Sequence, residues 1–335
     1  MTSKQSITVV VPCYNEADVL PLLYERLRNL SLEPEYRIDF VLVDDGSTDD
    51  TWSQISAICR EREGWKGIRL SRNFGHQRAL WSGFQQATGD AVFVLDADLQ
   101  DPPEKLRDFV EQWKNGHQVV YGVRTKRKES VWKKIAYKSF YRILARVADI
   151  EIPLDSGDFC LMDRQVVDAM LQSNETTPFI RGIRAWVGFR QVALEYERNP
   201  RAAGREKYSL SMLVELAING VFGFSRKPLR MITWSGLLVF GLGGMIALGF
   251  LLSIVLNASV PGDLGWMAAG MAGLSLSTGL ILTSIGIVGE YVGRVFEAAS
   301  ARPVSFVSEI SERPSDSPSR QENQFNVDFF RKRAA

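Results

Sequence analysis

Two pairs of carboxylates stand directly after apolar runs of the chain. Asp96 and Asp98 follow the run at 91–95, and Asp44 and Asp45 follow the run at 40–43. Residues two apart in an extended segment point the same way, so Asp96 and Asp98 can face one ligand. A hard divalent cation binds carboxylate and phosphate oxygens together, and it neutralises a departing diphosphate. The pattern favours a metal-assisted transfer site over a solvated acidic loop.

The elements that position these carboxylates follow from the periodicity. Apolar runs at 7–11, 40–43, 68–70 and 91–95 alternate with helical patterns at 17–30, 49–62 and 77–87. This alternation predicts an α/β fold with a mostly parallel sheet and helices on both faces. Ligands of such sheets bind beyond the carboxyl ends of the strands. The carboxylate pairs lie at those ends, as does the segment at 12–16.

Three motifs occur in order, namely Val11-Pro12-Cys13-Tyr14-Asn15-Glu16, Asp44-Asp45-Gly46-Ser47-Thr48-Asp49 and Asp96-Ala97-Asp98-Leu99-Gln100-Asp101-Pro102-Pro103. With them the chain resembles the inverting family 2 glycosyltransferases of the GT-A fold. More specifically, it resembles polyprenyl-phosphate glycosyltransferases, the group of the dolichol-phosphate mannose synthases and bactoprenol glucosyltransferases. The resemblance implies transfer of a sugar from a nucleotide-sugar donor to undecaprenyl or another polyprenyl phosphate, for cell-envelope glycan or lipopolysaccharide modification. It favours UDP-glucose or another UDP-sugar, while the sugar and a guanine base stay open.

The resemblance also implies donor-side residues. They are Pro12, Tyr14, Glu16, Asp44, Asp45, Asp96, Gln100, Arg201 and Lys207. The first five would hold the base and ribose, the next two would lie at the nucleotide and sugar, and the last two belong to a loop closing over the donor phosphates. Glu206 stands where the family usually has Ser, which leaves the geometry of that loop open. Asp98, together with Asp96, would bind Mg²⁺ or Mn²⁺.

Basic residues mark the acceptor side. Arg124 and Arg127 fit an Arg-x-x-Arg element of the family, and an arginine can grip a phosphate with two parallel hydrogen bonds. The resemblance therefore implies that both bind the acceptor phosphate, with Ser139 assisting. The lysines at 126, 128, 133 and 134 are expected at an anionic lipid surface.

Asp158 lies in Ser156-Gly157-Asp158-Phe159, which matches a Gly-Asp-Phe element of the family. It is a candidate general base or sugar-hydroxyl contact. A lipid monophosphate is already anionic at neutral pH, so we expect Asp158 mainly to position the reactants. Asp98, Asp158, Arg124 and Arg127 form the expected catalytic set. For His76 and His117 we expect structural hydrogen bonds rather than metal binding.

Two long segments carry no charge, at 231–262 and at 264–289. A helix needs about 20 apolar residues to cross a bilayer, so transmembrane helices are predicted at about 231–256 and 266–289. Basic residues flank the pair on both outer sides, namely Arg226, Lys227, Arg230, Arg294 and Arg302. The positive-inside rule then predicts a multi-pass protein of the inner (plasma) membrane, with the catalytic domain and both termini cytoplasmic. Two buried helices of a soluble protein are the alternative.

These observations divide the chain. Residues 1–205 form the expected catalytic domain, 206–230 a juxtamembrane interfacial region, 231–290 the membrane hairpin, and 303–335 a flexible cytoplasmic tail rich in Ser, Pro and charge. Glycines in both spans permit close helix packing or a homo-oligomer, although glycine is also simply common in membrane helices.

Composition excludes other classes. A net charge of +1 gives no expectation of nucleic-acid binding. Cys13, Cys59 and Cys160 have neither disulfide nor metal-site spacing, and we expect packed free thiols.

Two other functions remain as alternatives. A processive polysaccharide synthase would carry Gln-x-x-Arg-Trp and more spans, whereas this chain has Arg181-Gly182-Ile183-Arg184-Ala185-Trp186. A membrane scaffold or lipid transporter with a transferase-like domain is the other, and the intact acidic motifs argue against it.

Overall fold

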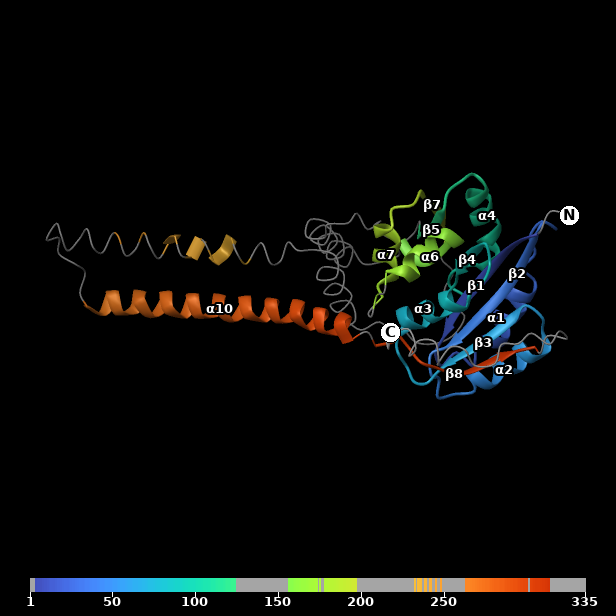
Figure 1. The fold of residues 1–335 in the computed structure, drawn as a ribbon, viewed down its shortest axis with the longest axis horizontal. Coiled ribbons are helices and arrows are strands. Elements are labelled where there is room, and N and C mark those ends of the chain that lie inside the picture. The colour runs from blue at the N-terminus through green and yellow to red at the C-terminus, as the bar shows by residue number, and fades with distance from the viewer. Residues whose placement is uncertain are drawn as a thin grey trace, which may run out of the picture.

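A computed structural model describes residues 4–124, 156–173, 175, 178–197, 263–300 and 302–313, with separate positions between 232 and 248. Its centre is an eight-stranded sheet in the order β7-β5-β6-β4-β1-β2-β3-β8 (Figure 1). The strands are β1 (Gln5–Cys13), β2 (Tyr36–Asp44), β3 (Trp65–Leu70), β4 (Ala91–Val94), β5 (Val119–Arg124), β6 (Ser156–Asp163), β7 (Gln191–Tyr196) and β8 (Val307–Glu312).

The middle of the sheet is parallel. β1 pairs in parallel with β2 and β4, and β2 pairs in parallel with β3. Antiparallel pairs join β6 to β4 and β5, and β8 to β3. The strand order reverses between β1 and β4, because β2 lies on one side of β1 and β4 on the other. The predicted mostly parallel α/β sheet is confirmed.

Helices cover both faces of the sheet (Figure 1). They are α1 (Leu20–Arg28), α2 (Thr51–Glu61), α3 (His76–Gln86), α4 (Leu106–Lys114), α6 (Arg164–Gln172) and α7 (Ile180–Trp186). On β1, Val9 and Val11 pack into the core with α1, α2 and α4, whereas Val10 packs with α3, α6 and α7. Strands buried on both faces read as unbroken apolar runs, which explains why the periodicity located them.

A glycine brings α3 close to the sheet. A Cβ on Gly83 would lie 2.3 Å from Cγ1 of Val10, so any side chain there would push the helix outward. The close contact sets how near α3 lies to β1. The first residue of α3, His76, lies at the carboxyl-end side of β1, where the acidic motifs collect.

A long helix, α10 (Asp263–Ser300), extends away from the sheet (Figure 1). Its window Leu276–Gly293 is long and apolar enough to cross a membrane, and none of that window is buried. α10 contains the second predicted span and continues past it. Of the first predicted span, the described positions between 232 and 248 are helical, and the rest lies outside the described residues, as does the predicted interfacial region at 206–230.

The predicted flexible tail from Pro303 is wrong for the segment at 304–313. Residues Val307–Glu312 form β8, which pairs with β3 at the edge of the sheet. The segment escaped prediction because polar groups hold it there. Ser311 is buried and donates to the carbonyl of Ser56, and Lys66 lies 3.5 Å from Glu312. The tail beyond 313 lies outside the described residues.

Candidate active site

The three motifs meet at the carboxyl ends of β1, β2 and β4, where ligands of such sheets bind. Backbone hydrogen bonds join the first motif to the second. The amide of Asn15 donates to Oγ of Ser47 at 2.9 Å, and the amide of Asp45 donates to the carbonyl of Cys13 at 2.9 Å. Pro12 is buried at the end of β1, while Tyr14 and Glu16 are partly exposed just beyond it. The first two motifs therefore lie side by side and form one side of the candidate site.

The two carboxylates of the second motif have different surroundings. Asp45 accepts the amides of Phe74 and Gly75, at 2.7 and 2.9 Å, and so orders the loop before α3. Asp44 is fully buried, and its Oδ1 accepts the amide of Ser47 at 3.1 Å. Burial raises the pKa of both carboxyls. Of the four oxygens, Oδ2 of Asp44 is buried and accepts no hydrogen bond from the described residues.

A tight backbone approach holds the two loops together. Gly46 has φ +67°, and a Cβ there would lie 2.4 Å from the carbonyl carbon of Arg72. Glycine satisfies both the positive φ and the close approach. The loop at 44–48 and the loop at 71–75 are therefore in close backbone contact.

Asp158, at the start of β6, lies in a dense polar cluster. Its side chain is 4% exposed, and it accepts Nε and Nη2 of Arg181 at 2.8 and 3.1 Å. Gln77 donates to its Oδ2 at 3.1 Å, and Nε2 of His76 lies 3.4 Å from the same oxygen. Burial alone would raise the pKa of Asp158, but Arg181 and His76 hold it well below its usual range. Asp158 is thus a fixed anion and a weak base.

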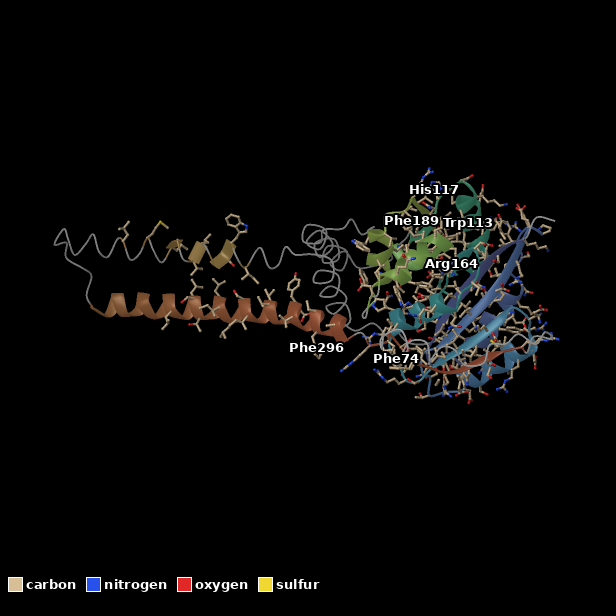
Figure 2. All side chains as sticks on the ribbon, in the orientation of Figure 1. Phe74, Trp113, His117, Arg164, Phe189 and Phe296 are labelled. Carbon is tan, nitrogen blue, oxygen red and sulfur yellow. The ribbon has the colours of Figure 1, made fainter. Side chains whose placement is uncertain are left out.

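His76 connects this cluster to the third motif. Its Nε2 lies 3.7 Å from Oδ1 of Asp96 as well as 3.4 Å from Asp158. Burial alone would lower the pKa of His76, yet the bond to Asp158 and the charge of Asp96 raise it overall. The structural hydrogen bond expected for His76 is present, and it lies inside the candidate site. His117, by contrast, lies just after α4, with its Nδ1 3.1 Å from the carbonyl oxygen of Gln112 (Figure 2).

The third motif concentrates negative charge. Oδ1 of Asp96 is buried, and no hydrogen bond reaches it from the described residues. Burial raises the pKa of Asp96 to about 6; His76 opposes this, while the carboxylates of Asp101, Asp158 and Asp98 add to it. Asp98 accepts the amide of Gln100 at 3.1 Å across a turn in which Leu99 has φ 56°. The motif presents oxygen ligands with an excess of negative charge.

This donor set fits Mg²⁺ or Mn²⁺. Both cations prefer carboxylate oxygens, and both keep coordination positions for water and substrate phosphate. Within the described ranges, no group of three or more His, Cys, Asp or Glu side chains forms a complete metal cage. Asp96 and Asp98 could hold such a cation if oxygens of a phosphorylated substrate complete its coordination.

Arg124, at the end of β5, belongs to a second polar network. Its Nε donates to the hydroxyl of Tyr196 at 3.3 Å, and that hydroxyl donates to Oδ1 of Asp101 at 2.6 Å. Nη2 of Arg124 lies 4.0 Å from Oδ2 of Asp101. This network links Arg124, where the predicted acceptor segment begins, to Asp101 of the third motif. Four expected site residues, Arg127, Ser139, Arg201 and Lys207, lie outside the described residues.

Sequence reasoning missed several members of these networks. From the sequence, Arg181 entered only the argument against a processive polysaccharide synthase. Asp101 and Tyr196 were given no individual role. Arg181 lies 23 residues from Asp158 and on a different element, so no local spacing connects them. The one available signal was an arginine pair on a short helix, Ile180–Trp186. The three cysteines are buried free thiols, as predicted.

Known proteins resemble this chain along nearly its full length. The model of glycosyl transferase family 2 matches residues 8–171, which include all three motifs. An uncharacterized glycosyltransferase of Bacillus subtilis (strain 168) is 41% identical over 302 residues, 90% of this chain and 92% of the relative. A bactoprenol glucosyl transferase of Shigella phage SfX is 33% identical, over 89% of this chain and 97% of the relative.

A solved structure has a similar arrangement. It is a mannosyltransferase from Pyrobaculum calidifontis in complex with GDP-Man and Mn²⁺, with 18% identity and a TM-score of 0.47 over 89% of this chain and 87% of that one. Nothing about the present site follows from a likeness at that level. The sequence relatives cover about nine-tenths of the chain at up to 41% identity, and the family model spans the three motifs: the chain belongs to glycosyltransferase family 2.

Proposed function

We propose that the chain transfers a sugar, with inversion, from a nucleotide-diphosphate sugar to polyprenyl phosphate. UDP-glucose or another UDP-sugar is the proposed donor. The observation that carries the proposal is the buried oxygen of Asp96, which has no hydrogen bond from the described residues, beside an Asp158 that stays ionised. The relatives named bactoprenol glucosyl transferase support the lipid acceptor.

The donor would lie across the switch point of the sheet. Pro12, Tyr14, Glu16 and Asp44 would hold the base and ribose, with Asp45 ordering the loop beneath them. Gln100 would lie near the sugar. Asp96 and Asp98 would hold Mg²⁺ or Mn²⁺, which supplies electrostatic stabilisation of the leaving diphosphate. Arg201 and Lys207 would close over the same phosphates.

The acceptor phosphate attacks in line. One of its oxygens forms a bond to the anomeric carbon as the bond from that carbon to the diphosphate breaks, which inverts the centre. Arg124, Arg127 and Ser139 would hold this phosphate. The nucleophile is already anionic at neutral pH. No general base is required, which agrees with an Asp158 whose pKa Arg181 holds low. Asp158 and His76 would position the reactants.

α10 supports a membrane location. Its exposed apolar side chains include Leu274, Leu282, Val292 and Phe296, which lipid would cover. We propose a multi-pass protein of the inner membrane with the catalytic domain and both termini in the cytoplasm. This arrangement brings the site close to a lipid-borne phosphate.

The test replaces Asp98 with Ala in the full chain in membranes given labelled UDP-sugar and polyprenyl phosphate. We expect the lipid-linked product to fall about a hundredfold or more, because charge stabilisation in transfer sites contributes on that scale. Asp108→Ala, at an exposed α4 pair with Lys105, is the matched control and should retain activity. Undiminished product from Asp98→Ala, or a polymer instead of a single transferred sugar, would overturn the proposal.

A further inference from the structure

The last described strand comes from beyond α10 and borders the donor side of the site. β8 pairs antiparallel with β3, and Glu309 stands directly opposite Arg69. The two residues are 240 positions apart in the chain. The family model ends at residue 171, so β8 lies outside the region that it matches. A segment after the long apolar helix thus returns to the catalytic domain.

Two hydrogen-bond donors orient the carboxylate of Glu309. Nη1 of Arg69 donates to Oε1 at 3.0 Å, and Nε1 of Trp52 donates to Oε2 at 3.0 Å. The hydrogen bonds from Arg69 and then Trp52 lower the pKa of Glu309. Each oxygen has its own partner, so the carboxylate has one preferred orientation although it lies at the surface.

Arg69 extends this contact to the second motif. Its Nε lies 3.4 Å from Oδ2 of Asp44, an ion-pair distance, and no hydrogen bond reaches that oxygen from the described residues. The guanidinium is therefore shared between Glu309 at the surface and Asp44 in the interior. Without Glu309, Arg69 is free either to close fully on Asp44 or to turn toward solvent. Both movements change the charge beside Asp44, the carboxylate that the proposed function assigns to the donor base.

The residues just before β8 support the adjoining loop. The carbonyl of Phe306 accepts the amide of Ser71 at 2.8 Å, and the Phe306 and Phe74 rings lie 6.4 Å apart. Phe74 in turn donates its amide to Asp45. Figure 2 shows Phe74 on the side of the domain from which α10 leaves. The segment at 305–309 thus contacts Phe74 and Arg69, which in turn contact Asp45 and Asp44 of the second motif.

We propose that Glu309 is a positioning residue for the nucleoside diphosphate part of the donor, acting through Arg69 on Asp44. The inference rests on the proposed function, since it assigns the base side of that donor site. The catalytic domain as matched by the family model is then incomplete without the segment that follows the membrane helix. Donor affinity, rather than the transfer step or lipid affinity, depends on Glu309.

The test compares Glu309→Gln with Glu312→Gln in the full chain in detergent. Both variants remove one exposed carboxylate from β8, and the carboxylate of Glu312 lies at ion-pair distance from Lys66 instead of Arg69. Binding of UDP and of GDP is measured by calorimetry, and kcat and both KM values by product formation. We expect Glu309→Gln to weaken binding of the preferred nucleotide and raise the donor KM about tenfold, the effect of losing one charged hydrogen bond. Its kcat and lipid KM should match those of Glu312→Gln.

A double variant separates positioning from loss of structure. In an Arg69→Gln background, Glu309→Gln should cause no further loss of nucleotide affinity, because the residue through which it acts is gone. Equal nucleotide affinities for Glu309→Gln and Glu312→Gln would overturn the inference while leaving the proposed function standing. So would a parallel fall in kcat, lipid affinity and thermal midpoint, which marks general loosening of β8. A parent protein that binds neither nucleotide and forms no product would overturn both.

Discussion

Replacing Arg181 with Gln should expose how much the buried carboxylate of Asp158 depends on its partner. In the parent chain, Asp158 accepts two hydrogen bonds from the guanidinium, at 2.8 and 3.1 Å. The carboxylate is 4% exposed, so solvent cannot replace the lost partner. The variant therefore leaves an anion in the interior with weaker compensation.

The size of the loss in unfolding free energy depends on the partners that Asp158 keeps in the variant. Removing one partner of a buried ion pair costs about 3–5 kcal/mol of unfolding free energy, and a hydrogen bond to a charged group contributes about 1.5–3 kcal/mol. Arg181 is itself 24% exposed, and Gln77 and His76 still face Asp158. We therefore expect a loss of about 2–3 kcal/mol, below the range for a fully buried pair and within the range for a charged hydrogen bond. This corresponds to a thermal midpoint lower by about 5–10 °C for a domain of this class.

The loss should depend on pH with a definite sign. The pKa of Asp158 is depressed in the folded chain, so the ion pair contributes its full stability above the unfolded pKa of about 4. That contribution disappears as the pH falls through the lower folded value. The difference between parent and Arg181→Gln should therefore be largest near neutral pH and shrink below about pH 4.

Thermal unfolding of the full chain in detergent measures both effects, in a double-mutant cycle with Asp158→Asn. Arg28→Gln is the control, because it removes an exposed pair with Glu25 whose contribution should stay below about 1 kcal/mol. If Arg181→Gln destabilises the Asp158→Asn background as much as the parent, the two residues are not coupled and the reasoning fails.

Two further predictions concern the third motif. Because burial raises the pKa of Asp96 to about 6, Mn²⁺ affinity should fall as the pH drops through that value, since a protonated carboxyl does not bind the cation. Paramagnetic resonance titrations read this directly, and equal affinity at about pH 5 and pH 7 would contradict it. Tyr196→Phe removes the hydroxyl that donates to Asp101 at 2.6 Å and should cost about 1–3 kcal/mol in thermal unfolding. An unchanged midpoint would show that the hydroxyl contributes nothing net.

The parts of the fold that the sequence predicted are those with a local signal. Strands β1, β2 and β4 are buried on both faces over their apolar runs, so their carboxyl ends could be located within a residue or two. Parallel strands bring those ends to one edge, which is why the three motifs were expected together. Geometry of this kind needs no knowledge of individual contacts.

The parts that it did not predict depend on contacts across long separations. Arg69 meets Glu309 on a strand made largely of Ser and Glu, which has no strong apolar period. An edge strand buries little, so charges and hydroxyls can hold it in place of a core. The same limit applies to the Tyr196 hydroxyl, which completes a network 95 residues from Asp101. Composition predicted a free tail, because the residues that hold β8 in place lie on β3 and α2, far away in the sequence.

The carboxylates of the site differ in what balances them, and this difference identifies where a cation is needed. Asp45 has two backbone amides, and Asp158 has Arg181, Gln77 and His76. Asp44 has one amide and part of Arg69. Asp96 alone of these four has an oxygen whose nearest described counter-charge is a histidine at 3.7 Å, and its pKa rises accordingly. A carboxylate with one buried oxygen that the described residues balance so poorly is costly in the free chain. A divalent cation with its bound phosphates would remove that cost, so the imbalance supports the proposal that metal and donor bind together at the third motif.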